Sequence, residues 1–312
     1  MALAGSGEAA ASAGAAACPL PVSRGRSLRV AAPAPFSFST VVRSHGWYDL
    51  PPFHYDPKGR ALTVTVSAPA GGTSIRFRDA EHGIEVDGGS ADPEAALRAI
   101  AQRVFSLDVD LTGFAAAAAA DPDLSWAVAR GAGRFLRAPS LWEDAVKMLF
   151  TTNCSWAATR GMVRRLIENF GEGGAFPGPG AIARRREGTL ARHVRSGYRT
   201  APLLALARNV DSGRLDLSRW EDARLESGEV RERIVEQPGF GPYAAEGLLR
   251  LIGRHDYFAI DSWTRMKYRK LHPGRGTIER AIARRYRRYG KFQGLAFWLD
   301  LTRDWHENGH EW

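Results

Sequence analysis

Between residues 36 and 89, hydrophobic and polar side chains alternate with a period of two. The alternation is clearest over residues 62–67 and returns over residues 75–77 and 84–86. Such a pattern is typical of strands that bury one face. A glycine-containing turn at residues 70–72 separates the first two runs, and we therefore predict an antiparallel sheet.

After about residue 120, the hydrophobic positions recur every three or four residues, which predicts helices. Ser140, with Glu143 three residues later, has the form of a capping box. Ser155 is placed to cap the next helix, which Gly171 ends. We predict an α+β chain in which residues 35–120 form a small antiparallel α+β domain and residues 121–312 form an all-helical domain.

Residues 1–34 are rich in Ala, Gly, Ser and Pro and contain a single acid, Glu8. We predict that this segment is a disordered leader. Two interpretations stay open, a plain flexible tail and an organelle transit peptide. A secretory signal is not expected, because no basic residue precedes the Ala-rich run.

Composition narrows the class of protein. The 312 residues include two cysteines, too few for a disulfide scaffold or a four-cysteine metal site, so a reducing compartment is expected. Every apolar run is too short to span a membrane. We expect a protein that is not secreted, in the cytoplasm or nucleoid of a bacterium or the nucleus or an organelle of a eukaryote.

The net charge of +9 favours a polyanionic partner. Residues 265–291 hold eleven Lys and Arg residues and one acid, Glu279, with tyrosines between them. This composition is common on nucleic-acid surfaces, but a solvated basic helical face fits it equally well.

The segment from Val230 to Leu271 is the most informative. Pro238-Gly239-Phe240-Gly241 lies between two helical patterns, and Asp261 follows twenty residues after Gly241. The glycines allow backbone N–H groups at the head of the second helix to approach a phosphate. An ordinary turn, with Asp261 serving only as a helix N-cap, is the competing interpretation.

This segment resembles the helix-hairpin-helix DNA glycosylase superfamily, which includes 3-methyladenine DNA glycosylase II and 8-oxoguanine DNA glycosylase. A second segment, LFTTNCSWAATRGMVRRLIENFG, resembles a helix pair of the 8-oxoguanine enzymes, and Ser196-Gly197-Tyr198-Arg199 is a weaker match. The resemblance spans residues 36 to 305 and implies that Asp261 is catalytic and that Asn153 enters the duplex.

The implied partner is double-stranded DNA with a damaged base, bound by a monomer. The residues expected to contact DNA are Asn153, Gly239, Phe240, Gly241, Tyr243, Arg265 and Lys267. Members of the superfamily that also nick the strand have a lysine where this chain has Tyr243. The resemblance therefore implies a monofunctional enzyme without lyase activity.

The residues of the expected base pocket bear on which base is excised. The expected base pocket is aromatic, with Trp156, Tyr243, Trp263 and Phe297. An aromatic pocket suits cationic alkylated purines, although each ring alone fits a core position as well. The alternatives are 8-oxoguanine excision and a non-catalytic DNA-binding module.

The histidines show no spacing with cysteines or carboxylates that is typical of a metal site. We expect no metal and no organic cofactor. The family resemblance implies one exception, a monovalent cation held by backbone carbonyls of the hairpin.

Overall fold

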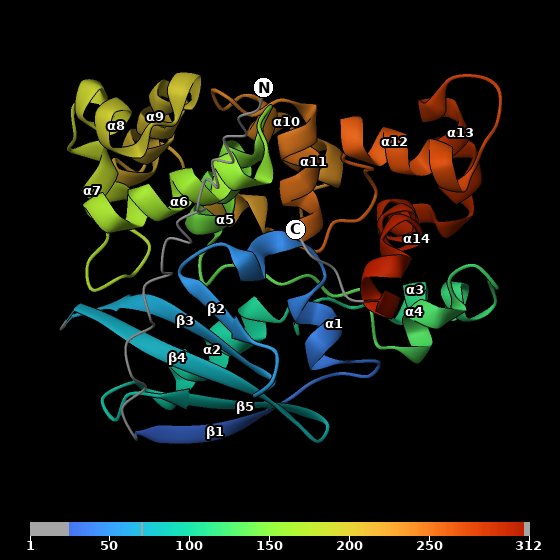
Figure 1. Ribbon diagram of the computed structural model, residues 1–312, viewed down its shortest axis with the longest axis horizontal. Coiled ribbons are helices and arrows are strands. Elements are labelled where there is room, and N and C mark those ends of the chain that lie inside the picture. The colour runs from blue at the N-terminus through green and yellow to red at the C-terminus, as the bar shows by residue number, and fades with distance from the viewer. Residues whose placement is uncertain (1–24, 70, 309–312) are drawn as a thin grey trace, which may run out of the picture.

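The computed structural model describes residues 25–69 and 71–308, and it confirms the predicted α+β class. A five-stranded antiparallel sheet lies beside a larger group of helices (Figure 1). The strand order is β1-β5-β4-β3-β2. The bounds are β1 (Arg26–Ala31), β2 (Phe53–Asp56), β3 (Ala61–Ala68), β4 (Gly71–Ala80) and β5 (Gly83–Gly88).

Strand β1 corrects the prediction of a disordered leader over residues 1–34. It pairs with β5, with Leu28 opposite Val86 and Val30 opposite Ile84. Val30 is buried, so this short alternating pattern adds an edge strand to the sheet instead of remaining unpaired. That part of the prediction was wrong, and residues 1–24 lie outside the described residues.

Helices α1 (Phe38–Val42) and α2 (Glu94–Val104) pack on the sheet. Phe105, directly after α2, contacts Phe38 of α1 and Phe77 of β4, with ring centroids 5.2 Å apart in both pairs. The inward positions of the alternating strands therefore meet the apolar stripe of α2, as the period-two pattern requires.

The helical part contains both predicted caps. Ser140 accepts the Glu143 N–H at the start of α5 (Leu141–Thr151), and Ser155 accepts the Ala158 N–H at the start of α6 (Trp156–Phe170). The further helices are α3 (Thr112–Ala119), α4 (Ser125–Ala129), α7 (Pro179–Ala183), α8 (Glu187–Val194), α9 (Thr200–Asp211), α10 (Ser227–Val235), α11 (Pro242–Leu251), α12 (Ser262–Leu271), α13 (Ile278–Tyr286) and α14 (Gln293–Asn308).

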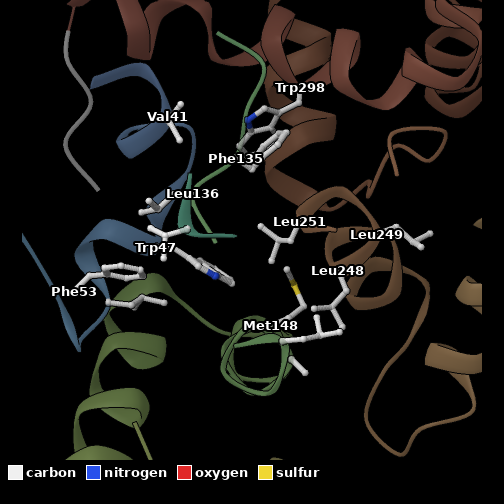
Figure 2. Close-up of a cluster of buried hydrophobic side chains, with 14 of the residues drawn as sticks. Val41, Trp47, Phe53, Phe135, Leu136, Met148, Leu248, Leu249, Leu251 and Trp298 are labelled. Atoms are coloured by element: carbon white, nitrogen blue, oxygen red, sulfur yellow. The ribbon is translucent and has the colours of Figure 1, made fainter. Parts of the chain in front are cut away.

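One hydrophobic core joins the sheet to the helices. Figure 2 shows Trp47, from beside the sheet, between Phe53 of β2 and the pair formed by Met148 of α5 and Leu251 of α11. Helix α3 belongs to the helical side of this core, because Phe114 contacts Tyr289 and Phe292 near the C-terminus. The predicted domain boundary at residue 120 had grouped α3 with the sheet.

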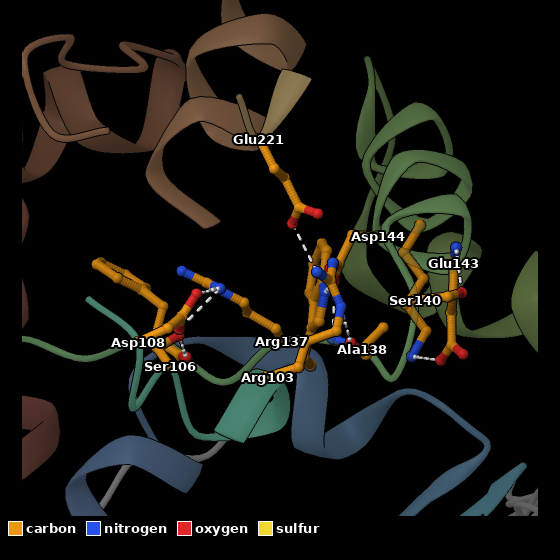
Figure 3. A network of polar contacts seen from close by, with 12 residues as sticks. Arg103, Ser106, Asp108, Arg137, Ala138, Ser140, Glu143, Asp144 and Glu221 are labelled. Carbon is orange, nitrogen blue, oxygen red and sulfur yellow. Dashed lines mark hydrogen bonds and ion pairs between the residues drawn. The ribbon is translucent and has the colours of Figure 1, made fainter. Parts of the chain in front are cut away.

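A buried ionic network also crosses between the two parts (Figure 3). Arg103 of α2 contacts Asp144 of α5 at 3.0 Å and Glu221 at 2.6 Å. Asp144 also accepts the Trp47 indole N–H and the Ala138 backbone N–H. Burial raises the pKa of Asp144, and Arg103 opposes that change. These bonds hold α5 against α2 and against the short turn at Trp47, and so position the loop that follows α5.

Candidate active site

The hairpin lies between α10 and α11, as predicted. Gly239 has φ +85°, and a Cβ atom there would lie 2.8 Å from the side chains of Leu149 and Pro202. A glycine is therefore required at position 239, because of its backbone conformation and because there is no space for a side chain. At Gly241, by contrast, φ is −83° and an added Cβ atom would meet nothing within 4 Å, so any residue could adopt this conformation. Pro242 opens α11.

Phe240 is buried beneath the hairpin, as expected for a residue without a polar role. Its backbone N–H donates to the carbonyl of Gln237. The ring of Phe240 is therefore a core group, and its N–H already has a partner within the hairpin. The monovalent cation at the hairpin carbonyls stays a prediction.

Asp261 caps α12 and forms a complete capping box with Thr264. Its Oδ1 accepts the Thr264 N–H at 2.7 Å, and its own N–H donates to Thr264 Oγ1 at 2.7 Å. Within the described part of the chain, Oδ2 has no hydrogen-bond or ion-pair partner. The cap thus orients the carboxylate and leaves one of its oxygens available.

The loop before Asp261 is attached to α11 at two points. Glu246 accepts the Ala259 N–H at 3.0 Å, and Glu246 is itself paired with Arg231 of α10 at 2.9 Å. Arg250 donates to the Phe258 carbonyl at 3.2 Å. Ala259 has φ +49°, a conformation that needs such support in a residue other than glycine.

Tyr243 and Arg250 of α11 are electrostatically coupled to Asp261. Burial, and then the Asp261 carboxylate, raise the pKa of Tyr243. Burial lowers the pKa of Arg250 to about 10, against the opposing effect of Tyr243, Asp261 and Glu246, so Arg250 stays charged at pH 7. Arg250 was not among the site residues predicted from the sequence. The available signal was a charged residue between two leucines, two helical turns after Tyr243.

The two other matched segments meet in the structure. Asn153, in the loop between α5 and α6, has φ +46° and donates from Nδ2 to the Tyr198 hydroxyl at 3.2 Å. Tyr198 is 57% exposed, and the guanidinium of Arg199 lies 4.4 Å from the centre of its ring. Asn153 and Tyr198 therefore form one surface feature built from separate parts of the chain.

The structure contradicts the predicted aromatic pocket at one residue, Phe297. Phe297 is fully buried among Phe258, Tyr268 and Tyr286, so it is a core residue. Trp156 stacks on Trp47 and donates its indole N–H to Asp49. Trp263 contacts Trp298 and Trp305. The sequence could not show these distant partners.

In the folded structure, acidic side chains pair with some of the basic residues of the 265–291 segment and offset part of its positive charge. Arg265 pairs with Glu279 at 2.9 Å and Lys267 with Asp304 at 2.5 Å, so both predicted DNA contacts already have acidic partners. Arg285 pairs with Asp123 at 2.9 Å. Several basic residues here are exposed, and they are Arg269, Lys270, Arg275, Arg280, Arg284, Arg287 and Lys291.

No protein-family model matches the sequence. A protein named probable N-glycosylase/DNA lyase from Methanothermobacter thermautotrophicus is 27% identical over 237 residues, which cover 64% of this chain and 72% of that relative. The 3-methyladenine DNA glycosylase of Archaeoglobus fulgidus matches with a TM-score of 0.69 and 16% identity, over 90% of this chain and 99% of the other. The chain has the fold of the helix-hairpin-helix DNA glycosylases.

This glycosylase fold confirms the resemblance found in the sequence. A Clostridium acetobutylicum 8-oxoguanine glycosylase/lyase bound to DNA also has a TM-score of 0.69 and 16% identity, over 88% of this chain and 93% of the other. The glycosylase fold therefore does not distinguish between the two kinds of lesion.

Over residues 25–69 and 71–308, no group of three or more His, Cys, Asp and Glu side chains is arranged to hold a metal ion. In the same residues, no helix has the length and apolar character needed to cross a membrane.

Proposed function

We propose that the protein is a base-excision DNA glycosylase that hydrolyses the N-glycosidic bond of a damaged base turned out of the duplex. The observation that carries this proposal is the geometry of Asp261. One carboxylate oxygen is held by the α12 cap, the other is without a partner among the described residues, and the loop before it is attached to the helix that follows the hairpin. The relatives named above support the same activity.

In this mechanism, the bond between C1′ and the base nitrogen breaks, and its electron pair leaves with the base. The sugar passes through an oxocarbenium-like state, which the negative charge of Asp261 stabilises. Asp261 Oδ2 accepts a proton as the oxygen of a water molecule bonds to C1′. The α12 cap fixes the position of the carboxylate before the sugar cation develops.

We also propose that the enzyme is monofunctional. An amine beside Asp261 would be needed for a Schiff base, and Tyr243 stands at the position where the resemblance expects that lysine. Lys267 is held by Asp304, and Lys147 is buried against Glu143. The product would then be an intact abasic site.

The proposed partner is duplex DNA, bound by a monomer. Two classes of base are candidates, alkylated purines and 8-oxoguanine. Alkylated purines are good leaving groups that need no acid catalyst, whereas the helix pair around Asn153 resembles 8-oxoguanine enzymes. The alternative function that is not enzymatic is a DNA-binding module without catalysis.

The test is single-turnover excision from a panel of duplexes, each with one lesion and each treated with alkali to reveal abasic sites. We expect Asp261→Asn to lower the excision rate about 10²- to 10⁴-fold. DNA affinity should remain, because asparagine also caps helices. Binding without excision by the wild type would favour the non-catalytic module, and an unchanged rate in Asp261→Asn would exclude Asp261 as the catalytic residue.

A further inference from the structure

A buried cation lies close to the candidate active site. Arg250 is 9% exposed, and its guanidinium is 4.3 Å from the ring centre of Trp298 and 5.7 Å from that of Phe135. Figure 2 shows Phe135 and Trp298 side by side near α11. Nη2 donates to the Phe258 carbonyl, whereas Nε is buried and has no hydrogen-bond partner among the described residues. Arg250 thus keeps a donor that the protein does not use.

Arg250 faces the same side of α11 as the candidate catalytic groups. Tyr243, Gly247 and Arg250 are spaced by four and three residues, which places them on one helical face. Gly247 lies between them on this face, and the Met148 side chain packs there, because an added Cβ atom would lie 2.7 Å from the Met148 methyl. The charge of Asp261 acts on both Tyr243 and Arg250.

The polar neighbours of Phe135 do not cancel the charge of Arg250. His45 and His255 both contact the Phe135 ring, at 5.7 and 5.9 Å between centroids. Burial lowers the pKa of each histidine to about 3, so both are neutral at pH 7. His45 Nε2 and His255 Nδ1 are also buried without a partner among the described residues.

We propose that Arg250 is a specificity-determining residue, which disfavours a positively charged base and favours a neutral base that carries a carbonyl oxygen. This inference rests on the proposed glycosylase function. The guanidinium already lies over the Trp298 ring, so that ring is not free for a cation–π contact with a base. Two like charges in a desolvated site repel each other, whereas the negative end of a carbonyl dipole is attracted to a positive charge.

The charge of Arg250 affects the two candidate classes of base differently. A cationic alkylated purine would meet Arg250 as a like charge, so its advantage as a leaving group would be offset by poor binding. 8-Oxoguanine is neutral and has two carbonyl oxygens. Arg250 therefore favours the second of the two candidate classes.

The experiment compares two neutral bases, 8-oxoguanine and hypoxanthine, with two cationic bases, 7-methylguanine and 1-methyladenine, in otherwise identical duplexes. Each single-turnover rate is divided by the spontaneous rate of base loss. We expect the wild type to prefer the neutral pair. Arg250→Met should raise the cationic-to-neutral ratio about tenfold or more, by loss of a like charge near the base.

Arg250→Lys is the matched control, because it loses the planar guanidinium as Arg250→Met does but keeps the positive charge. We expect its ratio to stay within about threefold of the wild type, since the like charge is retained. Should Arg250→Met fail to fold, the wild-type ratio and Arg250→Lys still decide. A wild type that prefers the cationic pair, or equal ratios in the two variants, would overturn the role of Arg250. Excision of none of the four bases would instead contradict the proposed function.

Discussion

Glu246 of α11 accepts the backbone N–H of Ala259 at 3.0 Å, two residues before Asp261. The same carboxylate pairs with Arg231 of α10, so one side chain links the two helices of the hairpin to the loop that ends at Asp261. Glu246 is thus a positioning residue that acts through Asp261.

We expect Glu246→Ala to lower the excision rate at least about tenfold and to destabilise the fold by about 1–3 kcal/mol, because Ala259 N–H and Arg231 lose their acceptor. Glu246→Gln, which keeps an acceptor for Ala259, should recover part of the rate. Affinity for an uncleavable duplex should change little in either variant. A rate in Glu246→Ala equal to that of the wild type would show that the loop holds Asp261 without Glu246.

Asn153 has a left-handed backbone, with φ +46°, and this allows its side chain to be tested separately from its conformation. Asn153→Gly suits that backbone, whereas Asn153→Ala should cost about 1 kcal/mol of stability. Both variants lose the amide, and we expect both to bind a lesion duplex more weakly to the same extent. Thermal melting and equilibrium binding measure the two effects. If Asn153→Gly bound DNA with the affinity of the wild type, the Asn153 side chain would not be a DNA contact.

Tyr243 provides the test of the monofunctional mechanism. Borohydride should trap no covalent complex between the wild type and lesion DNA. We expect Tyr243→Lys to form a trapped complex, because burial and the nearby Arg250 charge would lower the amine pKa and expose its lone pair. Tyr243→Phe is the control and should form none. Trapping by the wild type would mean that another amine reaches the sugar.

The lowered pKa of His255 predicts how the stability of the fold depends on pH. Burial, and then the charges of Arg250 and Arg137, lower its pKa from 6.5 to about 3. Between these values the unfolded chain binds a proton that the folded chain does not, so stability falls as the pH falls through this window. From pH 6.5 to 5, His255 should contribute a loss of about 2 kcal/mol, at about 1.4 kcal/mol per pH unit.

His255→Phe should remove that contribution, and denaturant unfolding at pH 7.5 and pH 5 measures it. Comparison of the variant with the wild type cancels the effects of other titrating groups, such as His45, which has a similarly lowered pKa. An identical pH dependence in the two proteins would mean that folding does not change the pKa of His255.

The local patterns of the chain determined much of this protein. Alternation over residues 62–67 is sufficient for a strand, and the serines at 140 and 155 cap helices because a cap needs only groups a few residues apart. The hairpin and the Asp261 cap are local in the same sense. For this reason, the α+β class and the glycosylase resemblance were both predictable from residues alone.

The tertiary structure decided which distant residues meet. It joined β1 to β5, buried Phe297, and gave Arg265 and Lys267 their acidic partners. It also placed Arg250 over Trp298, from a different helix, and close enough to Asp261 for their charges to interact. Burial and charge pairing depend on long-range packing, and hydrophobic periodicity contains no information about which side chain will cover which.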